Sequence, residues 1–179
     1  MSIDAKFEKI SQYENDGMVV VPTRKTSASA GYDFYAAETT VIPSYRNLFE
    51  SAPTFSTLTF GDMESVVKKF GLKVPLVPTG IKCKLPKGYF LQLSARSSLP
   101  LKHWLIVANG VGIIDADYYN NSDNEGHIYF QLINLAPWDI VIEKGDCFGQ
   151  GIILPYETTS DDDNNDVIRS GGLGSTSES

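Results

Sequence analysis

The chain has 179 residues, 42% of them hydrophobic and 11% aromatic, which predicts one folded domain with a substantial core. Its formal net charge of −7 argues against binding to a nucleic acid backbone, and no apolar run approaches the roughly 18 residues of a membrane span. The N-terminal stretch MSIDAKFEKI lacks the apolar segment of a signal peptide, and the two cysteines form no CxxC pair. We therefore expect a cytoplasmic protein without structural zinc.

Short runs rich in β-branched and aromatic residues recur along the chain, separated by Pro- and Gly-containing turn signals such as Pro78-Thr-Gly80 and Lys144-Gly-Asp146. Many short strands at this spacing indicate an all-β sandwich or barrel rather than βαβ units. The predicted strands are Met18–Val21, Ala36–Pro43, Leu76–Leu85, Tyr89–Ser94, Leu105–Val107, Ile128–Leu135 and Phe148–Pro155.

One segment has helical spacing instead. Asp62 is placed to cap the N-terminus of this helix, and Gly71 follows its last turn. We predict a short amphipathic helix over Asp62–Phe70 that packs on the sheet. Its apolar stripe, for which core packing is the simpler interpretation, consists of Phe60, Met63, Val66, Val67 and Phe70.

The end of the chain changes character. Residues 161–166 carry four acids, and the stretch that follows combines one Arg with Gly, Ser and Thr. This composition is typical of a disordered tail. It also suits an arm that wraps a phosphate, because glycines let the backbone come close and the hydroxyls, N–H groups and Arg bind anions.

The most unusual stretch runs from Asn109 to Tyr118, where Asp115 leaves an apolar run. A carboxylate in this position can hold a water and act as a general base, although an Asp at a strand end more often caps a turn. Arg96 next to Ser97 and Ser98 can bind phosphate oxygens or lie in a solvated turn. Asp33 and Gln150 are weaker candidates when read alone.

Together, five ordered segments resemble the five motifs of the trimeric deoxyuridine triphosphatases (dUTPases). The likeness runs from about Val21 to Thr176 and is interrupted by 45–73 and 119–125. The segments are Ala30-Gly-Tyr-Asp-Phe34, Ala95-Arg-Ser-Ser-Leu99, Asn109-Gly-Val-Gly-Ile-Ile-Asp-Ala-Asp-Tyr118, Lys144-Gly-Asp-Cys-Phe-Gly-Gln150 and Arg169-Ser-Gly-Gly-Leu-Gly-Ser-Thr176.

The resemblance implies a jelly-roll-like β barrel over 1–160, with one short inserted helix in the 45–73 insertion and a flexible C-terminal arm over 161–179. It implies Mg²⁺-dependent hydrolysis of dUTP to dUMP and pyrophosphate in a homotrimer with shared active sites, in a bacterial or phage-infected cell. The longer segment after Tyr118 predicts a longer hairpin tip, and Leu173 stands where the family usually has Phe.

The resemblance also implies roles for single residues. Asp115 is the base that activates water, Tyr118 lies under the deoxyribose, and Asp33 holds waters of the Mg²⁺ shell. Uracil is read largely through backbone groups of Asn109, Gly112, Ile113, Ile114, Ile128 and Tyr129. The phosphates are bound by Arg96, Ser97, Ser98 and Gln150, and by the arm residues Arg169, Gly171, Gly172, Leu173, Gly174, Ser175 and Thr176.

Three alternatives stand beside this interpretation. A dCTP deaminase, a relative with the same fold, needs a Glu where this chain has Gln131, and an amide cannot shuttle the proton. A regulatory module would bind a protein partner through the 45–73 insertion. A capsid-like or sugar-binding jelly roll would not need the Gly-rich basic arm.

Overall fold

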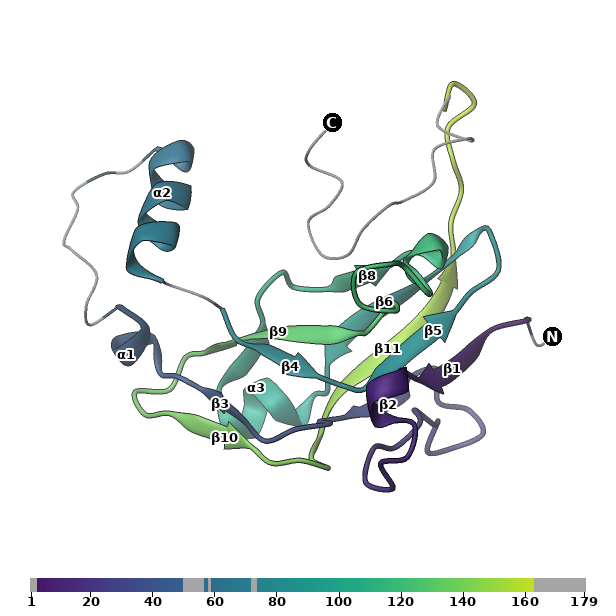
Figure 1. The fold of residues 1–179 in the computed structure, drawn as a ribbon, viewed down its shortest axis with the longest axis horizontal. Helices are drawn as coiled ribbons and strands as arrows, with labels where there is room; N and C mark the ends of the chain where they lie inside the picture. The colour runs from purple at the N-terminus through teal and green to yellow at the C-terminus, as the bar shows by residue number, and fades with distance from the viewer. Residues whose placement is uncertain (1–2, 50–56, 58, 72–73, 163–179) are drawn as a thin grey trace.

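The structure is a computed structural model that describes residues 3–49, 57, 59–71 and 74–162 (Figure 1). The expected all-β class is confirmed, since strands make up most of the regular structure. The strands are β1 (Lys6–Lys9), β2 (Tyr32–Tyr35), β3 (Thr40–Ile42), β4 (Leu76–Pro78), β5 (Ile81–Lys84), β6 (Tyr89–Ala95), β7 (Leu105–Val107), β8 (Gly112–Ile114), β9 (Tyr129–Asn134), β10 (Ile140–Ile142) and β11 (Cys147–Pro155). The α-helices are α1 (Tyr45–Phe49), α2 (Phe60–Phe70) and α3 (Ser98–His103), and short 3-10 helices span Ser11–Tyr13 and Ala116–Tyr118.

In the described part of the chain, four antiparallel sheets wrap around one core (Figure 1). The largest has the strand order β2-β11-β6-β8, and the second has the order β4-β9-β7. Two-stranded pairs, β1-β5 and β10-β3, lie beside them. No helix in the described part of the chain is long and apolar enough to cross a membrane.

The two larger sheets pack face to face through aromatic rings. Phe130 of β9 lies 5.6 Å from Phe34 of β2 and 5.0 Å from Phe148 of β11, centroid to centroid. Glycines of β11 make this close packing possible: a Cβ on Gly149 would come within 2.6 Å of the Phe130 ring. A Cβ on Gly151 would come within 2.8 Å of Phe34. The core therefore requires glycine on either side of Gln150.

The strand predictions were mostly right in place and wrong at several boundaries. The strand Leu105–Val107 is confirmed. The three longest strands, β6, β9 and β11, are also present, and their ends differ from the predicted ends by one or two residues in total for each strand. The predicted strand Leu76–Leu85 is two strands, because Gly80 with φ of +70° turns the chain between β4 and β5. Met18–Val21 is not a strand, since the Asp16 carboxylate accepts the Met18 N–H at 2.9 Å and holds a turn.

The predicted helix exists, but two details were wrong. The N-cap is Thr59 rather than Asp62; Asp62 is the third helical residue, and the two side chains bind each other's backbone N–H. Gly71 ends the helix in the left-handed conformation, as expected. The helix does not pack on the sheet: Figure 1 shows α2 standing apart from the barrel, with Met63 41% and Val67 36% exposed. Helical periodicity identifies an apolar face but not the surface that covers it.

Two further helices were not predicted. α1 also belongs to the 45–73 insertion, and α3 follows β6 directly.

Candidate active site

A polar pocket lies on one face of the β2-β11-β6 sheet. Pairing in register places Gln150 of β11 between Asp33 of β2 and Ser94 of β6, so these three side chains share that face. Arg96 and Ser97 follow the end of β6. The polar pocket has a volume of about 260 Å³ and is lined by Lys25, Ser29, Gly31, Asp33, Arg96, Ser97 and Gln150. Four sequence-predicted residues from three distant segments thus meet here.

The polar pocket contains a buried acid with spare hydrogen-bonding capacity. Nε of Arg96 lies 3.3 Å from Oδ1 of Asp33, whereas Oδ2 of Asp33 is buried without a hydrogen-bond partner among the described residues. Such an oxygen is costly to leave unpaired, so it indicates a place for a water or ion. Gly31 leaves room for Gln150, because a Cβ there would lie 2.9 Å from the amide oxygen.

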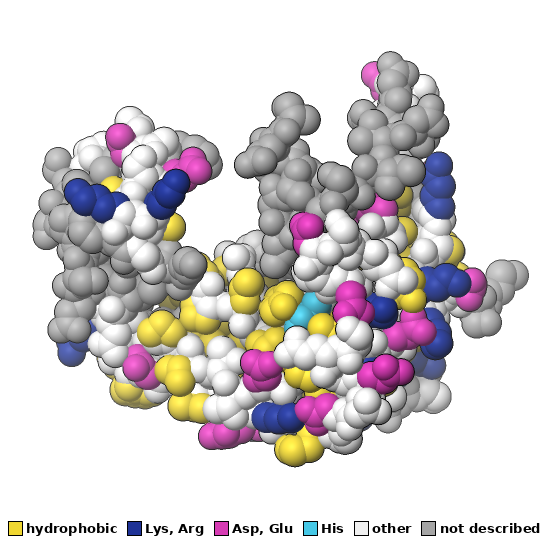
Figure 2. All heavy atoms as spheres, in the orientation of Figure 1, with side chains coloured by type: hydrophobic (Ala, Val, Ile, Leu, Met, Phe, Trp, Pro, Cys, Tyr) yellow, Lys and Arg dark blue, Asp and Glu magenta, His cyan; other side chains and the backbone are white. Residues whose placement is uncertain are grey.

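A second pocket lies where β8 meets β9. This hairpin pocket has a volume of about 270 Å³ and is lined by Leu76, Leu93, Val107, Asn109, Gly112, Ile113, Ile114, Tyr129, Phe130 and Gln131. Five residues predicted to read uracil are among them. β8 is the edge strand of its sheet, and an edge strand offers unpaired backbone N–H and C=O groups. Figure 2 shows apolar side chains gathered over β4 and β9 on this face. The hairpin pocket can therefore hold a flat ring and pair with its polar edge.

Asp115 directly follows β8 and is exposed. Its carbonyl accepts the Tyr118 N–H at 3.2 Å, across the 3-10 helix Ala116–Tyr118. Tyr118 is 3% exposed and donates its hydroxyl to the His127 carbonyl at 2.9 Å. Asp115 can meet a water, while the sugar contact of Tyr118 stays a prediction.

The two pockets lie at different places on the same sheet. The hairpin pocket lies along the edge strand β8 and is lined by neighbouring residues from both faces of it, Ile113 and Ile114, whereas the polar pocket spans β2, β11 and the end of β6. Asp115 and Arg96 lie toward opposite ends of β6, because Ile114 pairs with Leu91, which sets Asp115 level with Phe90, while Arg96 follows the last residue of the strand. At about 3.3 Å per residue, Asp115 and Arg96 are about 20 Å apart along the strand.

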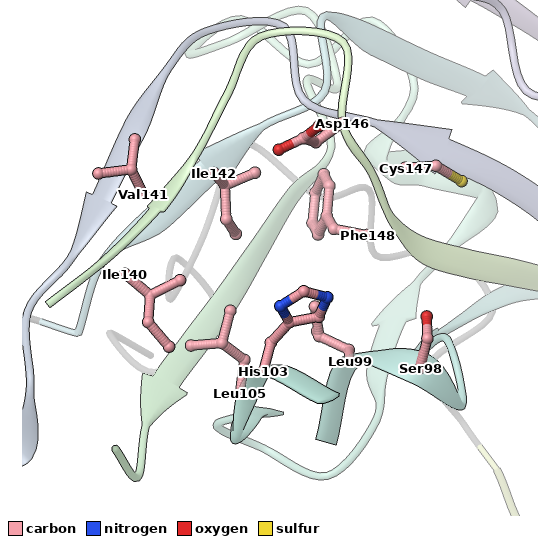
Figure 3. Close-up of a pocket in the computed structure, with 10 residues that line it drawn as sticks. All are labelled: Ser98, Leu99, His103, Leu105, Ile140, Val141, Ile142, Asp146, Cys147 and Phe148. Atoms are coloured by element: carbon pink, nitrogen blue, oxygen red, sulfur yellow. The ribbon is translucent and has the colours of Figure 1, made fainter. Parts of the chain in front are cut away.

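A third cavity, of about 180 Å³, lies between α3 and the strands β10 and β11 (Figure 3). Figure 3 shows the His103 ring below Phe148, among the apolar side chains of Leu99 and Leu105, with Ser98 at one margin. Ser98 therefore lines this cavity, whereas its neighbour Ser97 lines the polar pocket.

The segment inserted after Tyr118 forms a compact loop that the sequence did not specify. Asn124 donates its side-chain N–H to the Tyr118 hydroxyl at 2.8 Å, and Asn121 donates to the Tyr118 carbonyl at 2.8 Å. Gly126, with φ of +81°, must be glycine, because a Cβ would lie 2.7 Å from the Tyr118 carbonyl oxygen. The loop thus fixes Tyr118 from both ends.

His127 supports the hairpin pocket from behind. Its Nε2 accepts the Gly80 N–H at 2.8 Å, and its ring centroid lies 4.0 Å from that of Tyr129. Burial lowers the pKa of His127 to about 4, so it is neutral at physiological pH.

Sequence reasoning missed His127, Lys25 and Ser29, none of which belongs to a quoted motif. Ile128 is fully buried, and Arg169, Gly171, Gly172, Leu173, Gly174, Ser175 and Thr176 lie outside the described residues.

Comparisons with known proteins match this arrangement of motifs. The dUTPase family model matches residues 64–177. Deoxyuridine 5'-triphosphate nucleotidohydrolase of Lactococcus lactis subsp. lactis is 38% identical over 171 residues, which cover 95% of each chain. The chain belongs to the dUTPase family.

Solved structures of the family agree with the fold. A dUTPase from Streptococcus mutans superposes with a TM-score of 0.67 at 35% identity, over 86% of this chain and 97% of that one. The dUTPase of phage phi11 of S. aureus, described for its species-specific insert, gives a TM-score of 0.61 at 19% identity, over 88% and 93%. The family and the jelly-roll-like barrel that the motifs predicted are confirmed.

Proposed function

We propose that the active site for dUTP combines the hairpin pocket and Asp115 of one subunit with the polar pocket of another. As a dUTP diphosphatase, the chain hydrolyses dUTP to dUMP and pyrophosphate. The observation that carries the proposed site is the separation of the two pockets on one sheet, the hairpin pocket at the edge strand β8 and the polar pocket over β2, β11 and the end of β6. Neither pocket alone offers both a ring-sized apolar slot and a cation.

The hairpin pocket takes the uracil ring. Backbone groups of β8 and of the turn at Asn109 pair with the polar edge of the ring, while Ile113 and Tyr129 border it. This close fit leaves no room for a 5-methyl group. Tyr118 then lies under the deoxyribose and excludes a 2′-hydroxyl.

Asp115 holds the attacking water against the α-phosphorus and accepts its proton. The exposed position after β8 supports this role, since a base must reach solvent before the substrate arrives. Aligning water, base and phosphorus can supply about 7–11 kcal/mol of the barrier, so position matters more here than basicity.

The polar pocket binds the phosphates. Arg96 donates to phosphate oxygens, and Ser97 and Gln150 donate from beside it. Ser98 begins α3 next to this pocket. The arm residues 169–176 close over the triphosphate and exclude water, so we expect deletion after Ile168 to reduce turnover.

Residues of the polar pocket fit a magnesium ion held through water. Among the described residues, no group of three or more acids, histidines or cysteines could hold a metal directly. The unpaired Oδ2 of Asp33 instead suits a water of the ion's shell, because Mg²⁺ keeps several waters and takes its other ligands from phosphates. When bound, the ion neutralises phosphate charge that a chain of net charge −7 would otherwise repel.

Assembly follows from the separated pockets. A closed ring of subunits lets every hairpin pocket meet a neighbour's polar pocket, and the trimer of the family is the assembly we propose.

The exposed Met63 and Val67 of α2 favour a second role for the insertion. They could be covered by a protein partner, as the regulatory interpretation expects. Deleting 45–73 would then leave turnover intact and abolish capture of that partner. Loss of turnover on deletion would place the insertion within the enzyme itself.

Pyrophosphate release tests the proposed catalysis. With Mg²⁺ present, we expect release from dUTP and not from dTTP, dCTP or UTP. Asp115→Asn should lower kcat by about a hundredfold or more. Asp117→Asn, two residues along and also exposed, is the matched control and should stay active. Full activity of Asp115→Asn would remove Asp115 as the base.

A further inference from the structure

The loop formed by residues 24–30 borders the polar pocket and closes on itself. Nη1 of Arg24 donates to the carbonyls of Ser27 and Ser29, at 3.0 and 2.9 Å. Thr26 and Ser29 exchange side-chain and backbone hydrogen bonds at 3.0 Å. On the other side of the loop, Asp33 of β2 donates its N–H to the Thr23 carbonyl at 3.0 Å. The loop therefore holds Lys25 at a fixed place beside the pocket.

The Lys25 side chain also contacts β2. Its Nζ donates to the Tyr35 hydroxyl at 2.6 Å and lies 5.3 Å from the centroid of that ring. Tyr35 and Asp33 are two residues apart on one strand, so their side chains share the face on which the polar pocket opens. Lys25 lines the polar pocket together with Arg96.

The charge of the pocket depends on Lys25. Its charged lining residues are Lys25, Arg96 and Asp33, and Arg96 is paired with Asp33 at 3.3 Å. With Lys25 the three charges sum to +1; without it they sum to zero. The remaining chain is acidic, with a net charge of −7 overall. Lys25 is thus the charge that makes this pocket attractive to an anion.

We propose that Lys25 is a second cationic ligand of the substrate, binding the β- and γ-phosphates that leave as pyrophosphate. This inference rests on the proposed assignment of the polar pocket to the phosphates. The uracil ring and the attacked α-phosphorus belong at the hairpin pocket and Asp115, so the far end of the triphosphate meets the Lys25 side. The hydrogen bond that Lys25 donates to the Tyr35 hydroxyl raises the pKa of Lys25 and keeps the ammonium charged. Three donors on a compact ammonium suit phosphate oxygens whose position shifts as the bond breaks.

Lys25→Gln tests the inference, with Lys25→Arg as the charge-retaining variant. Lys6→Gln is the matched control, because Lys6 is an exposed lysine of β1 paired with Glu8 at 2.7 Å. At fixed ionic strength, Lys25→Gln should raise the KM for dUTP about tenfold with kcat changed less than about twofold. The dissociation constant for inorganic pyrophosphate, measured by calorimetry, should rise by the same factor, while that for dUMP stays constant. Lys25→Arg should restore most of the affinity.

Two results would overturn the inference: unchanged pyrophosphate affinity in Lys25→Gln, or an equal loss in Lys6→Gln. Because Lys25 is exposed, an unchanged melting temperature is expected and excludes unfolding as the cause. Failure of the proposed function would look different, since the wild-type protein itself would then release no pyrophosphate from dUTP.

Discussion

Mixing two inactive variants should restore activity if the active site is shared. Asp115→Asn removes the base and leaves the polar pocket intact, and Arg96→Gln does the reverse. The two pockets lie at different places on the β2-β11-β6-β8 sheet, with Asp115 and Arg96 about 20 Å apart along β6. A site that takes Asp115 from one subunit and Arg96 from another can therefore be whole in a mixed assembly.

The size of the recovery follows from counting donors. In an equal mixture, half of the Asp115 donors and half of the Arg96 donors are intact, so about one site in four has both. Pyrophosphate release from dUTP should reach about a quarter of the wild-type value at the same total chain concentration, after joint unfolding and refolding or co-expression. Each variant alone should stay near zero.

A second mixture separates shared sites from sites within one chain. When wild type is mixed equally with the double variant, shared sites again give about a quarter of full activity, whereas sites within one chain give about a half. No recovery in the first mixture, together with half activity in the second, would refute the shared site.

Three further predictions concern stability and the arm. Gly149→Ala should destabilise the fold by about 1–3 kcal/mol in urea unfolding, because its methyl group would lie 2.6 Å from the Phe130 ring; unchanged stability would mean that the ring can move. Burial lowers the pKa of His127 to about 4, so His127 binds a proton more readily in the unfolded chain than in the folded one. Its contribution to the free energy of unfolding is therefore complete above about pH 6.5 and is lost as pH falls toward 4. That contribution is at most about 3 kcal/mol, and His127→Phe should flatten the fall of the melting temperature between pH 6.5 and 5; an identical slope would argue against it. Deletion after Ile168 should cut kcat/KM for dUTP while the melting temperature stays constant, since the removed segment has few apolar residues; a large drop would make the segment structural.

Much of the fold could be predicted because strand signals are local. Apolar runs bounded by Pro and Gly located β6, β7, β9 and β11 within a residue or two. The run Met18–Val21 misled because a single carboxylate, from Asp16, turned the chain there. β2 was missed because Asp33 interrupts its apolar character. The apolar stripe of α2 led to the wrong prediction that this helix packs on the sheet. The spacing of apolar residues along a helix does not specify which surface covers them.

Individual residues of the candidate site could be predicted where they belong to one of the sequence motifs. Asp33, Arg96, Ser97 and Gln150 do meet in one pocket, as their order in the motifs suggested. Lys25 was missed because its place depends on how residues 24–30 close on themselves. The separation of the two pockets could not be predicted either, because it depends on the order and register of β6, β8 and β11 rather than on any residue type.

The irregularity in β11 determines which side of the sheet Gln150 occupies. Cys147 lies opposite Tyr35 and Gly149 opposite Phe34, so β11 has one extra residue here relative to β2, as in a β-bulge. Simple alternation from the buried Phe148 would turn Gln150 inward; the extra residue reverses the parity, and Gly149 and Gly151 face the core instead. Removing one residue from this part of β11 would exchange interior and exterior positions along the rest of the strand. The amide would enter the aromatic core, and glycines would face the substrate. The length of this short segment is therefore as constrained as its chemistry, and a frame-preserving deletion of one residue here would inactivate and destabilise the protein together.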